Sequence, residues 1–232
     1  IKKSATVITR RVNTVADFLI AQQVKAIVVA CNTATVNAIE QLRARVSIPI
    51  IGVEPAIKPA SIQSTTKNVG ILVTSATAKN ERFLALVKKH STNIKAFIQP
   101  CPGLVQLIEH NHINTPECTA LLKQYITPLN DNEVDTIVLG CTHYPFVASQ
   151  ISLLVNEGTQ LIETAMPVTI ELTRRLKQAQ LCSVAFHPNA SNEITHLFYC
   201  QQLTPQLQQT VAQLWQGSHS ISLLQTNLHE SI

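Results

Sequence analysis

Two of the six cysteines occupy matching positions in the sequence, each directly after a short apolar run. Cys31 follows the run at 26–30 and Cys141 follows the run at 136–140. Both runs have the length and the β-branched composition of a buried strand. A helix is expected after each cysteine, and the N-terminus of a helix favours the thiolate form of a nearby thiol. Two such thiols in one chain suggest a pair that acts together.

Two opposed thiols can move protons on both faces of a carbon acid. One thiolate removes a proton from one face, and the other thiol returns a proton to the opposite face, which inverts the centre. A thiol, with an ordinary pKa of about 8.5, suits this work at neutral pH better than Lys or Tyr. His143, two residues after Cys141, is expected to share a proton with it or with the substrate. Small polar side chains suited to carboxylate and ammonium groups are Asn32, Thr33, Thr77 and Thr142.

The elements that must position these residues alternate between strands and helices. Strands are predicted at 26–30, 48–53, 68–74, 94–99, 136–140, 160–164, 195–202 and 221–224. Helices are predicted at 4–23, 35–45, 78–90, 104–111, 116–127, 145–155, 168–179 and 204–217, residues 182–186 are left open between strand and loop, and 189–192 are a turn. This order is typical of an α/β fold with parallel sheets and helices on both faces. Ligands of such sheets bind beyond the C-terminal ends of the strands, where both cysteines are expected.

The composition excludes several classes of protein. The 232 residues are 45% hydrophobic and 14% charged, with a formal charge of +4, as in a soluble globular chain of one large or two small domains. No apolar run approaches the ~18 residues of a membrane span, and no signal-peptide core follows the start. Basic and aromatic residues do not interleave, which argues against a nucleic-acid partner. Scattered cysteines favour a reducing, cytoplasmic compartment, and the histidines lack the spacing of metal ligands.

Two motifs carry a resemblance to a known family. Ala30-Cys-Asn-Thr-Ala-Thr35 and Leu139-Gly-Cys-Thr-His-Tyr-Pro145 resemble the two cysteine motifs of glutamate racemase. Supporting similarity lies at 49–55, 69–77 and 101–109, and the likeness runs from residue 1 to about 175 and more weakly to 217. The resemblance implies a cytoplasmic isomerase that interconverts L- and D-glutamate without a cofactor. Its product, D-glutamate, would serve peptidoglycan synthesis, and so cell wall biogenesis and cell shape.

The resemblance also implies an architecture and a set of site residues. It implies two pseudo-symmetric, doubly wound parallel-sheet domains with the active site in the cleft between them: residues 1–55 plus 164–232, discontinuous and N-terminally incomplete, and residues 56–163. Cys31 and Cys141 would be the two acid/bases, with His143 and Glu109 as auxiliaries. The expected contacts to glutamate are Asn32, Thr33, Thr77, Thr142 and His143. A plain helix-end carboxylate is an equally open interpretation of Glu109, and Cys101, Cys118, Cys182 and Cys200 are interpreted as inert packing.

The sequence departs from the family at its start. It begins without Met, and the Asp-Ser-Gly and Pro-Tyr-Gly stretches with which the family opens are absent, so a truncated first domain is expected. Three alternatives remain open. They are a truncated, inactive or ligand-binding-only chain, a racemase for another amino acid such as aspartate, and a redox switch in which Cys31 and Cys141 form a disulfide. The expected partner is the small-molecule substrate, and a homodimer is left open.

Overall fold

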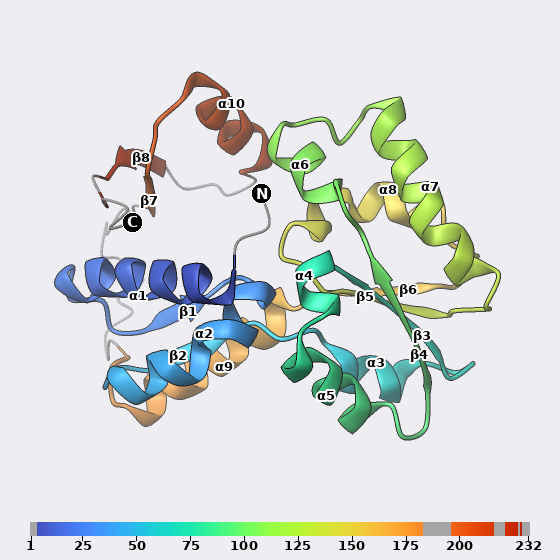
Figure 1. Ribbon diagram of the computed structural model, residues 1–232, viewed down its shortest axis with the longest axis horizontal. Coiled ribbons are helices and arrows are strands. Elements are labelled where there is room, and N and C mark those ends of the chain that lie inside the picture. The colour runs from blue at the N-terminus through green and yellow to red at the C-terminus, as the bar shows by residue number, and fades with distance from the viewer. Residues whose placement is uncertain (1–3, 183–195, 216–220, 227, 229–232) are drawn as a thin grey trace, which may run out of the picture.

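The computed structural model describes residues 4–182, 196–215, 221–226 and 228, and its elements alternate between helices and parallel strands (Figure 1). The first half contains α1 (Ala5–Ala21), β1 (Ile27–Val29), α2 (Asn32–Arg45), β2 (Ile50–Gly52), α3 (Ile57–Gln63), β3 (Asn68–Val73), α4 (Ser75–Ala78), α5 (Glu81–His90), β4 (Lys95–Pro100) and α6 (Leu104–Glu109). It continues with α7 (Pro116–Asn130), β5 (Thr136–Leu139), the 3₁₀ helix η1 (Tyr144–Val147), α8 (Ala148–Ser152), β6 (Gln160–Ile162), α9 (Ala165–Gln178), β7 (His196–Cys200), α10 (Pro205–Leu214) and β8 (Ile221–Gln225).

The larger sheet has four parallel strands in the order β4-β3-β5-β6. Side chains that alternate along its central strands enter two different cores, as the period of two in a strand requires. Leu72 and Ile137 pack toward α6, α7 and α8, whereas Ile71 and Val138 pack toward α3 and α5. The sheet is therefore covered by helices on both faces, and this buries both of its faces from water (Figure 1).

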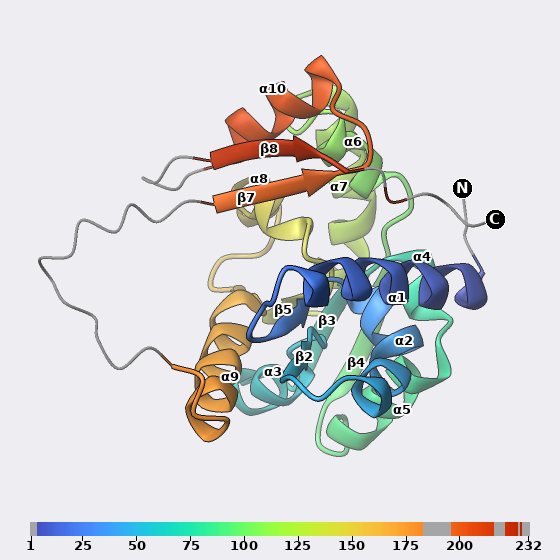
Figure 2. The same cartoon turned by 90° about the vertical axis from the view of Figure 1, so that its left-hand side faces the viewer.

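Two smaller parallel sheets lie on the other side of the molecule. β1 pairs with β2, and their core includes Ile27 and Ile50 together with Ile39 and Leu42 of α2. Helix α9 returns from the larger sheet to lie beside β2 (Figure 1). β7 pairs in parallel with β8, and helix α10 connects the two strands along the chain. This unit lies over α1 (Figure 2).

The α/β class with parallel sheets is confirmed, but several predicted elements were wrong in detail. The helix after the first cysteine begins at Asn32 rather than at residue 35. The single helix expected at 145–155 is instead η1 followed by the short α8. Helix α3, with Pro59 in its first turn, was not predicted at all. The predictions for 183–186 and 189–192 lie outside the described residues, and the division at 55/56 and 163/164 remains a prediction.

Within the part of the chain that the structure describes, no helix combines the length and the apolar character that crossing a bilayer demands.

Candidate active site

The first corner of the site is the end of β1. Cys31 is the N-cap residue of α2, with extended backbone angles of φ −154° and ψ 119°. Its carbonyl accepts the first helical hydrogen bond, from the N–H of Thr35, at 2.8 Å. Its thiol makes no capping hydrogen bond, and the residue is exposed. The sulfur is therefore not used to hold the helix end and is free to meet a ligand.

The second corner, at the end of β5, is buried. Cys141 is 7% exposed, and the residue before it, Gly140, passes so close to β3 that an added Cβ would lie 2.6 Å from the carbonyl oxygen of Leu72. Burial raises the pKa of the Cys141 thiol to about 11, the backbone N–H of His143 lowers it, and the nearby Cys31 and Glu109 raise it further. The expectation that both corners favour the thiolate is therefore wrong for Cys141. A 3₁₀ turn, not an α-helix N-terminus, follows it, and burial penalises its charged form.

Two reciprocal hydrogen bonds join the corners. The Nδ2 of Asn32 donates to the carbonyl oxygen of Gly140 at 2.8 Å, and the hydroxyl of Thr142 donates to the carbonyl oxygen of Ala30 at 3.1 Å. In each case the residue after one cysteine binds the residue before the other. Segments more than a hundred residues apart in the sequence, 108 and 112 for the two bonds, are thereby held side by side. Cys31 and Cys141 also lie close enough for the charge of one to affect the other.

A chain of titratable groups extends from the buried thiol to the surface. Cys141 Sγ lies 3.9 Å from Nδ1 of His143, and Nε2 of the same ring lies 3.2 Å from Oε1 of Glu109. The His143 side chain is 35% exposed and that of Glu109 is 59% exposed. This arrangement can pass a proton between Cys141 and solvent, and it provides Glu109 with a partner that an ordinary helix-end carboxylate would lack.

Three threonine hydroxyls form a triangle between α2 and α4. The oxygens of Thr33 and Thr77 lie 2.9 Å apart, those of Thr74 and Thr77 lie 3.0 Å apart, and those of Thr33 and Thr74 lie 3.1 Å apart. Thr77 is fully buried, and the hydroxyl of Thr74 also accepts the N–H of Thr77 as the N-cap of α4. The cluster can present hydroxyl donors to a carboxylate. Thr33 and Thr77 were predicted from the sequence but Thr74 was not, although its position at the C-terminal end of the strand predicted at 68–74 was a signal.

One buried acceptor at the corners has no partner. Asn32 is 3% exposed, and its Oδ1 accepts no hydrogen bond from the described residues, while its Nδ2 is bound to Gly140. A buried oxygen of this kind costs free energy unless a ligand supplies a donor. It is suited to an ammonium group.

The other cysteines differ from this pair. Burial raises the pKa of Cys101 to about 12, and Cys118 is fully buried in the same core. Cys182 is exposed and Cys200 is partly exposed, so the interpretation as inert packing is wrong for Cys182. All six cysteines are free thiols, Cys31 and Cys141 included. Within the described ranges, no group of three His, Cys, Asp or Glu residues is arranged to hold a metal ion.

The C-terminal part of the chain also reaches the site, which the sequence analysis did not anticipate. Thr210 of α10 is 7% exposed and donates its hydroxyl to the carbonyl oxygen of Glu109 at 3.3 Å, where α10 lies beside α6 (Figure 1). The sequence held no signal for this contact, because a threonine in a Gln-rich helix is typical of a solvated face.

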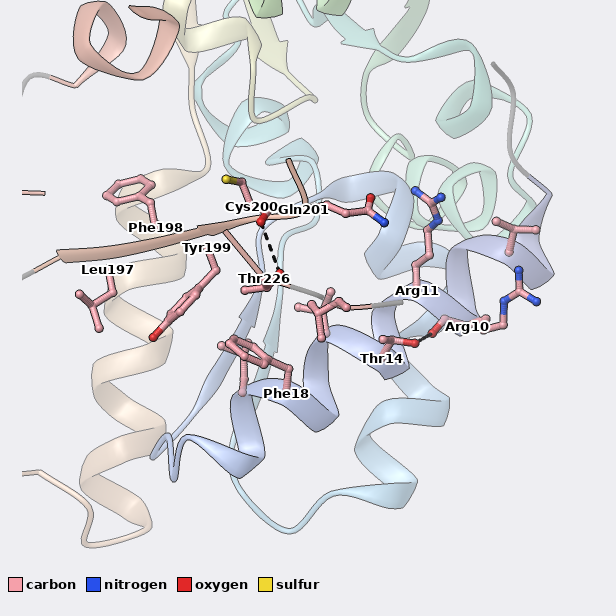
Figure 3. Close-up of a pocket in the computed structure, with 14 residues that line it drawn as sticks. Arg10, Arg11, Thr14, Phe18, Leu197, Phe198, Tyr199, Cys200, Gln201 and Thr226 are labelled. Atoms are coloured by element: carbon pink, nitrogen blue, oxygen red, sulfur yellow. Dashed lines mark hydrogen bonds between the residues drawn. The ribbon is translucent and has the colours of Figure 1, made fainter. Parts of the chain in front are cut away.

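A separate cavity of about 720 Å³ lies between α1 and β7, away from both cysteines (Figure 3). Its wall is mainly apolar and includes Val15, Phe18 and Leu197, and the rings of Phe18 and Tyr199 meet edge to face at 4.9 Å. Arg10 and Arg11 lie at one end. The cavity contains none of the residues that the sequence analysis assigned to the site.

Comparisons with known proteins agree with this geometry. Residues 2–172 match the Asp/Glu/Hydantoin racemase family. The glutamate racemase of Pseudomonas aeruginosa PAO1 is 36% identical over 224 residues, which cover 96% of this chain and 82% of that protein. The glutamate racemase of Methylococcus capsulatus is 36% identical over 219 residues, 94% of this chain and 79% of that protein.

Solved structures extend the match to the fold. Glutamate racemase isoform RacE1 of Bacillus anthracis superposes with a TM-score of 0.81 at 26% identity, covering 96% of this chain and 82% of that one. The Escherichia coli glutamate racemase, solved with L-glutamate and the activator UDP-MurNAc-Ala, has a TM-score of 0.81 at 27% identity, covering 97% and 83%. The resemblance stated from the two cysteine motifs is thus confirmed. The chain belongs to the Asp/Glu/Hydantoin racemase family.

Proposed function

We propose that this protein is a glutamate racemase that inverts the α-carbon by proton transfer between Cys31 and Cys141, without a cofactor. The observation that carries the proposal is the reciprocal pairing of the two cysteine corners, which brings together two thiols from the ends of two strands. The product would be D-glutamate for peptidoglycan, made in the cytoplasm.

The two thiols take different roles in the proposed reaction. Because burial raises the pKa of Cys141 to about 11, this thiol holds its proton at neutral pH and can donate it. Cys31, exposed and free of a capping bond, acts as the thiolate base for the enantiomer whose α-proton faces it. It removes that proton, and the resulting carbanion takes the Cys141 proton on the opposite face. After this turnover the two thiols have exchanged their protonation states, and the other enantiomer is the substrate of the new form.

The remaining site residues are assigned by their hydrogen-bonding capacity. The unpartnered Oδ1 of Asn32 accepts from the α-ammonium group, and the Thr142 oxygen, whose hydrogen is already donated, accepts there as well. The hydroxyl of Thr33 donates to a carboxylate of glutamate, and the buried hydroxyl of Thr77 supports this contact by donating to Thr33. His143 contacts the substrate. Together with Glu109 it carries a proton between Cys141 and solvent, which restores the starting protonation state of Cys141 between turnovers.

The test is racemisation in D₂O, followed by chiral chromatography and by the NMR signal of the α-proton. L- and D-glutamate should each give the racemate with solvent deuterium at the α-position, and aspartate should turn over far more slowly. Cys31→Ser and Cys141→Ser should each lose at least a hundredfold in racemisation, since a positioned acid/base contributes about 10²–10⁴ in rate. The exposed Cys182→Ser is the matched control.

Three results would overturn the proposal. Full racemisation by both single variants would exclude the two-thiol mechanism, and faster turnover of aspartate would reassign the substrate. A folded protein that binds glutamate without exchanging its α-proton would be a ligand-binding chain. Sedimentation of the same preparation tests the homodimer that the sequence leaves open.

A further inference from the structure

The two hydrogen bonds between the cysteine corners form a symmetrical pair. Asn32, one residue after Cys31, binds the carbonyl of Gly140, one residue before Cys141. Thr142, one residue after Cys141, binds the carbonyl of Ala30, one residue before Cys31. Each cysteine therefore lies between a donor to the opposite corner and an acceptor from it. We call these two bonds, with their four residues Ala30, Asn32, Gly140 and Thr142, the corner clasp.

The clasp acts on the separation of the thiols more directly than ordinary packing can. A single hydrogen bond between two bodies leaves rotation about that bond, whereas two bonds placed on either side of each cysteine fix the distance and the rotation together. Both bonds end on backbone carbonyls one peptide unit from a reacting residue, so a shift at either bond is passed to the sulfur through a single rigid peptide plane. The two corners belong to different sheets, β1-β2 and β4-β3-β5-β6, so no strand ladder holds them in register.

Both donors of the clasp are committed before a substrate arrives. Asn32 uses its Nδ2 on Gly140 and keeps Oδ1 unpartnered. Thr142 uses its one hydroxyl hydrogen on Ala30 and keeps only acceptor capacity. In Asn32, positioning by donation and substrate contact by acceptance therefore belong to different atoms, and substitution can separate the two roles. In Thr142 one hydroxyl carries both.

The geometry points to Asn32 and Thr142 as positioning residues, whose reciprocal hydrogen bonds to Gly140 and Ala30 set the gap between the two reacting thiols. This inference rests on the proposed two-thiol reaction and adds what holds its geometry. A displacement of about 1 Å between reacting groups can cost roughly a hundredfold in rate, so loss of one bond is expected to lower kcat by about tenfold to a hundredfold.

Two substitutions remove the donors and retain the rest of the side chain. Asn32→Asp keeps an acceptor oxygen for the substrate but loses the amide donor. Thr142→Val keeps the shape but loses the hydroxyl, and Thr142→Ser restores it. Because Asn32 is 3% exposed, its substitution risks misfolding. Thr142, which is less buried, provides the second variant.

Matched controls come from bonds of the same kind elsewhere. Asn130→Asp removes the hydrogen bond of 2.8 Å from the side-chain amide to the carbonyl oxygen of Leu154. Thr169→Val removes the hydrogen bond of 3.0 Å from the hydroxyl to the carbonyl oxygen of Ala165. Neither bond joins the two corners. Both controls should leave racemisation and thiol bridging within about twofold of the parent.

The separation of the two thiols is measured by their bridging with dibromobimane, which becomes fluorescent when it joins neighbouring thiols. If Asn32 and Thr142 had only a structural role, their substitution would leave the bridging rate unchanged. It is measured in a Cys182→Ser, Cys200→Ser background, with the bridged peptides identified by mass. Asn32→Asp and Thr142→Val should slow bridging at least tenfold and lower kcat by a similar factor. KM should stay within about threefold in Asn32→Asp, which keeps its acceptor oxygen. Thr142→Ser should recover both the bridging rate and kcat.

Other outcomes overturn the inference. Bridging at the parental rate in both variants would show that the bonds do not set the gap, and a raised KM with an unchanged kcat would make the two residues binding groups only. If bridging slows while kcat is unchanged, the clasp stands and the two-thiol reaction of the proposed function fails.

Discussion

Replacing Cys31 by serine isolates the buried thiol and permits its protonation state to be measured. The variant should no longer racemise, but Cys141 can still remove the α-proton of one enantiomer and return a solvent deuteron to the same face. This exchange needs the thiolate of Cys141. Burial raises the pKa of that thiol from an ordinary value of about 8.5 to 9.0 to about 11. At pH 8 the thiolate fraction is therefore about a hundredfold lower than in an ordinary thiol, a cost of about 2.7 kcal/mol.

The consequence is a steep pH dependence of the exchange. Removal of Cys31 takes away one of the neighbours that raise the pKa, but burial, the largest cause, remains. The exchange measured as kcat/KM should rise about tenfold per pH unit from pH 7 to pH 10, with no plateau. The assay is loss of the α-proton NMR signal of each enantiomer in D₂O, together with the rate at which iodoacetamide alkylates Cys141. The background for alkylation carries Cys182→Ser and Cys200→Ser.

Two results would refute this reasoning. A plateau below pH 9, in exchange and alkylation alike, would mean that the pocket does not penalise the thiolate. Exchange of both enantiomers at similar rates would mean that Cys141 does not serve a single face of the α-carbon. Cys141→Ser is the complementary variant and should exchange only the opposite enantiomer.

Three further predictions concern the surroundings of the site. Glu109→Gln and His143→Asn should each lower kcat by roughly tenfold, and the double variant should lose little more than either, because the two side chains act as one chain to Cys141 and coupled residues are not additive. The free energy of unfolding should fall above pH 9 by about 1.4 kcal/mol per pH unit for each of Cys141 and Cys101, measured by urea unfolding. Burial raises the pKa of these thiols to about 11 and about 12. Their contribution to stability is therefore complete below the pKa of the unfolded thiol and is lost as the pH rises through those values. An unchanged dependence of the unfolding free energy on pH in Cys101→Ala would contradict this. Burial would raise the pKa of Asp135, but hydrogen bonds from Ser64, Thr66 and Thr65 hold it well below its usual range. Asp135→Asn should therefore cost about 2 kcal/mol at pH 7. The difference from the parent should disappear as the pH falls from about 4 toward the lowered pKa, and exposed Asp131→Asn is the control.

Much of the fold follows from local patterns. The β-branched runs before Cys31 and Cys141 predicted β1 and β5, because a short apolar run without alternation is typical of a strand in a parallel sheet covered by helices. Helix boundaries were less accurate where short-range and long-range effects compete. Pro145 predicted the start of a long helix. Tyr144 is instead completely buried, and the chain forms a 3₁₀ helix there before α8.

Part of the chemistry of the site could also be predicted from the sequence. The motifs around the two cysteines predicted a shared site for Asn32, Thr33, Thr142 and His143, because ligands of parallel sheets bind beyond the C-terminal ends of the strands. Thr210 could not be identified in this way, since α10 and α6 meet through a contact between residues 101 positions apart.

The sequence alone determined that two thiols stand at the ends of two buried strands, and with them the family, because strand-forming runs and turn chemistry are local properties of the chain. Only the tertiary structure decided that the thiols are unequal, one exposed at the N-cap of α2 and the other buried with its pKa raised to about 11. It alone also decided that Asn32 and Thr142 donate to the opposite corners. The physical reason is that burial and cross-corner hydrogen bonds depend on which distant segments meet, and no local pattern of residues encodes that meeting.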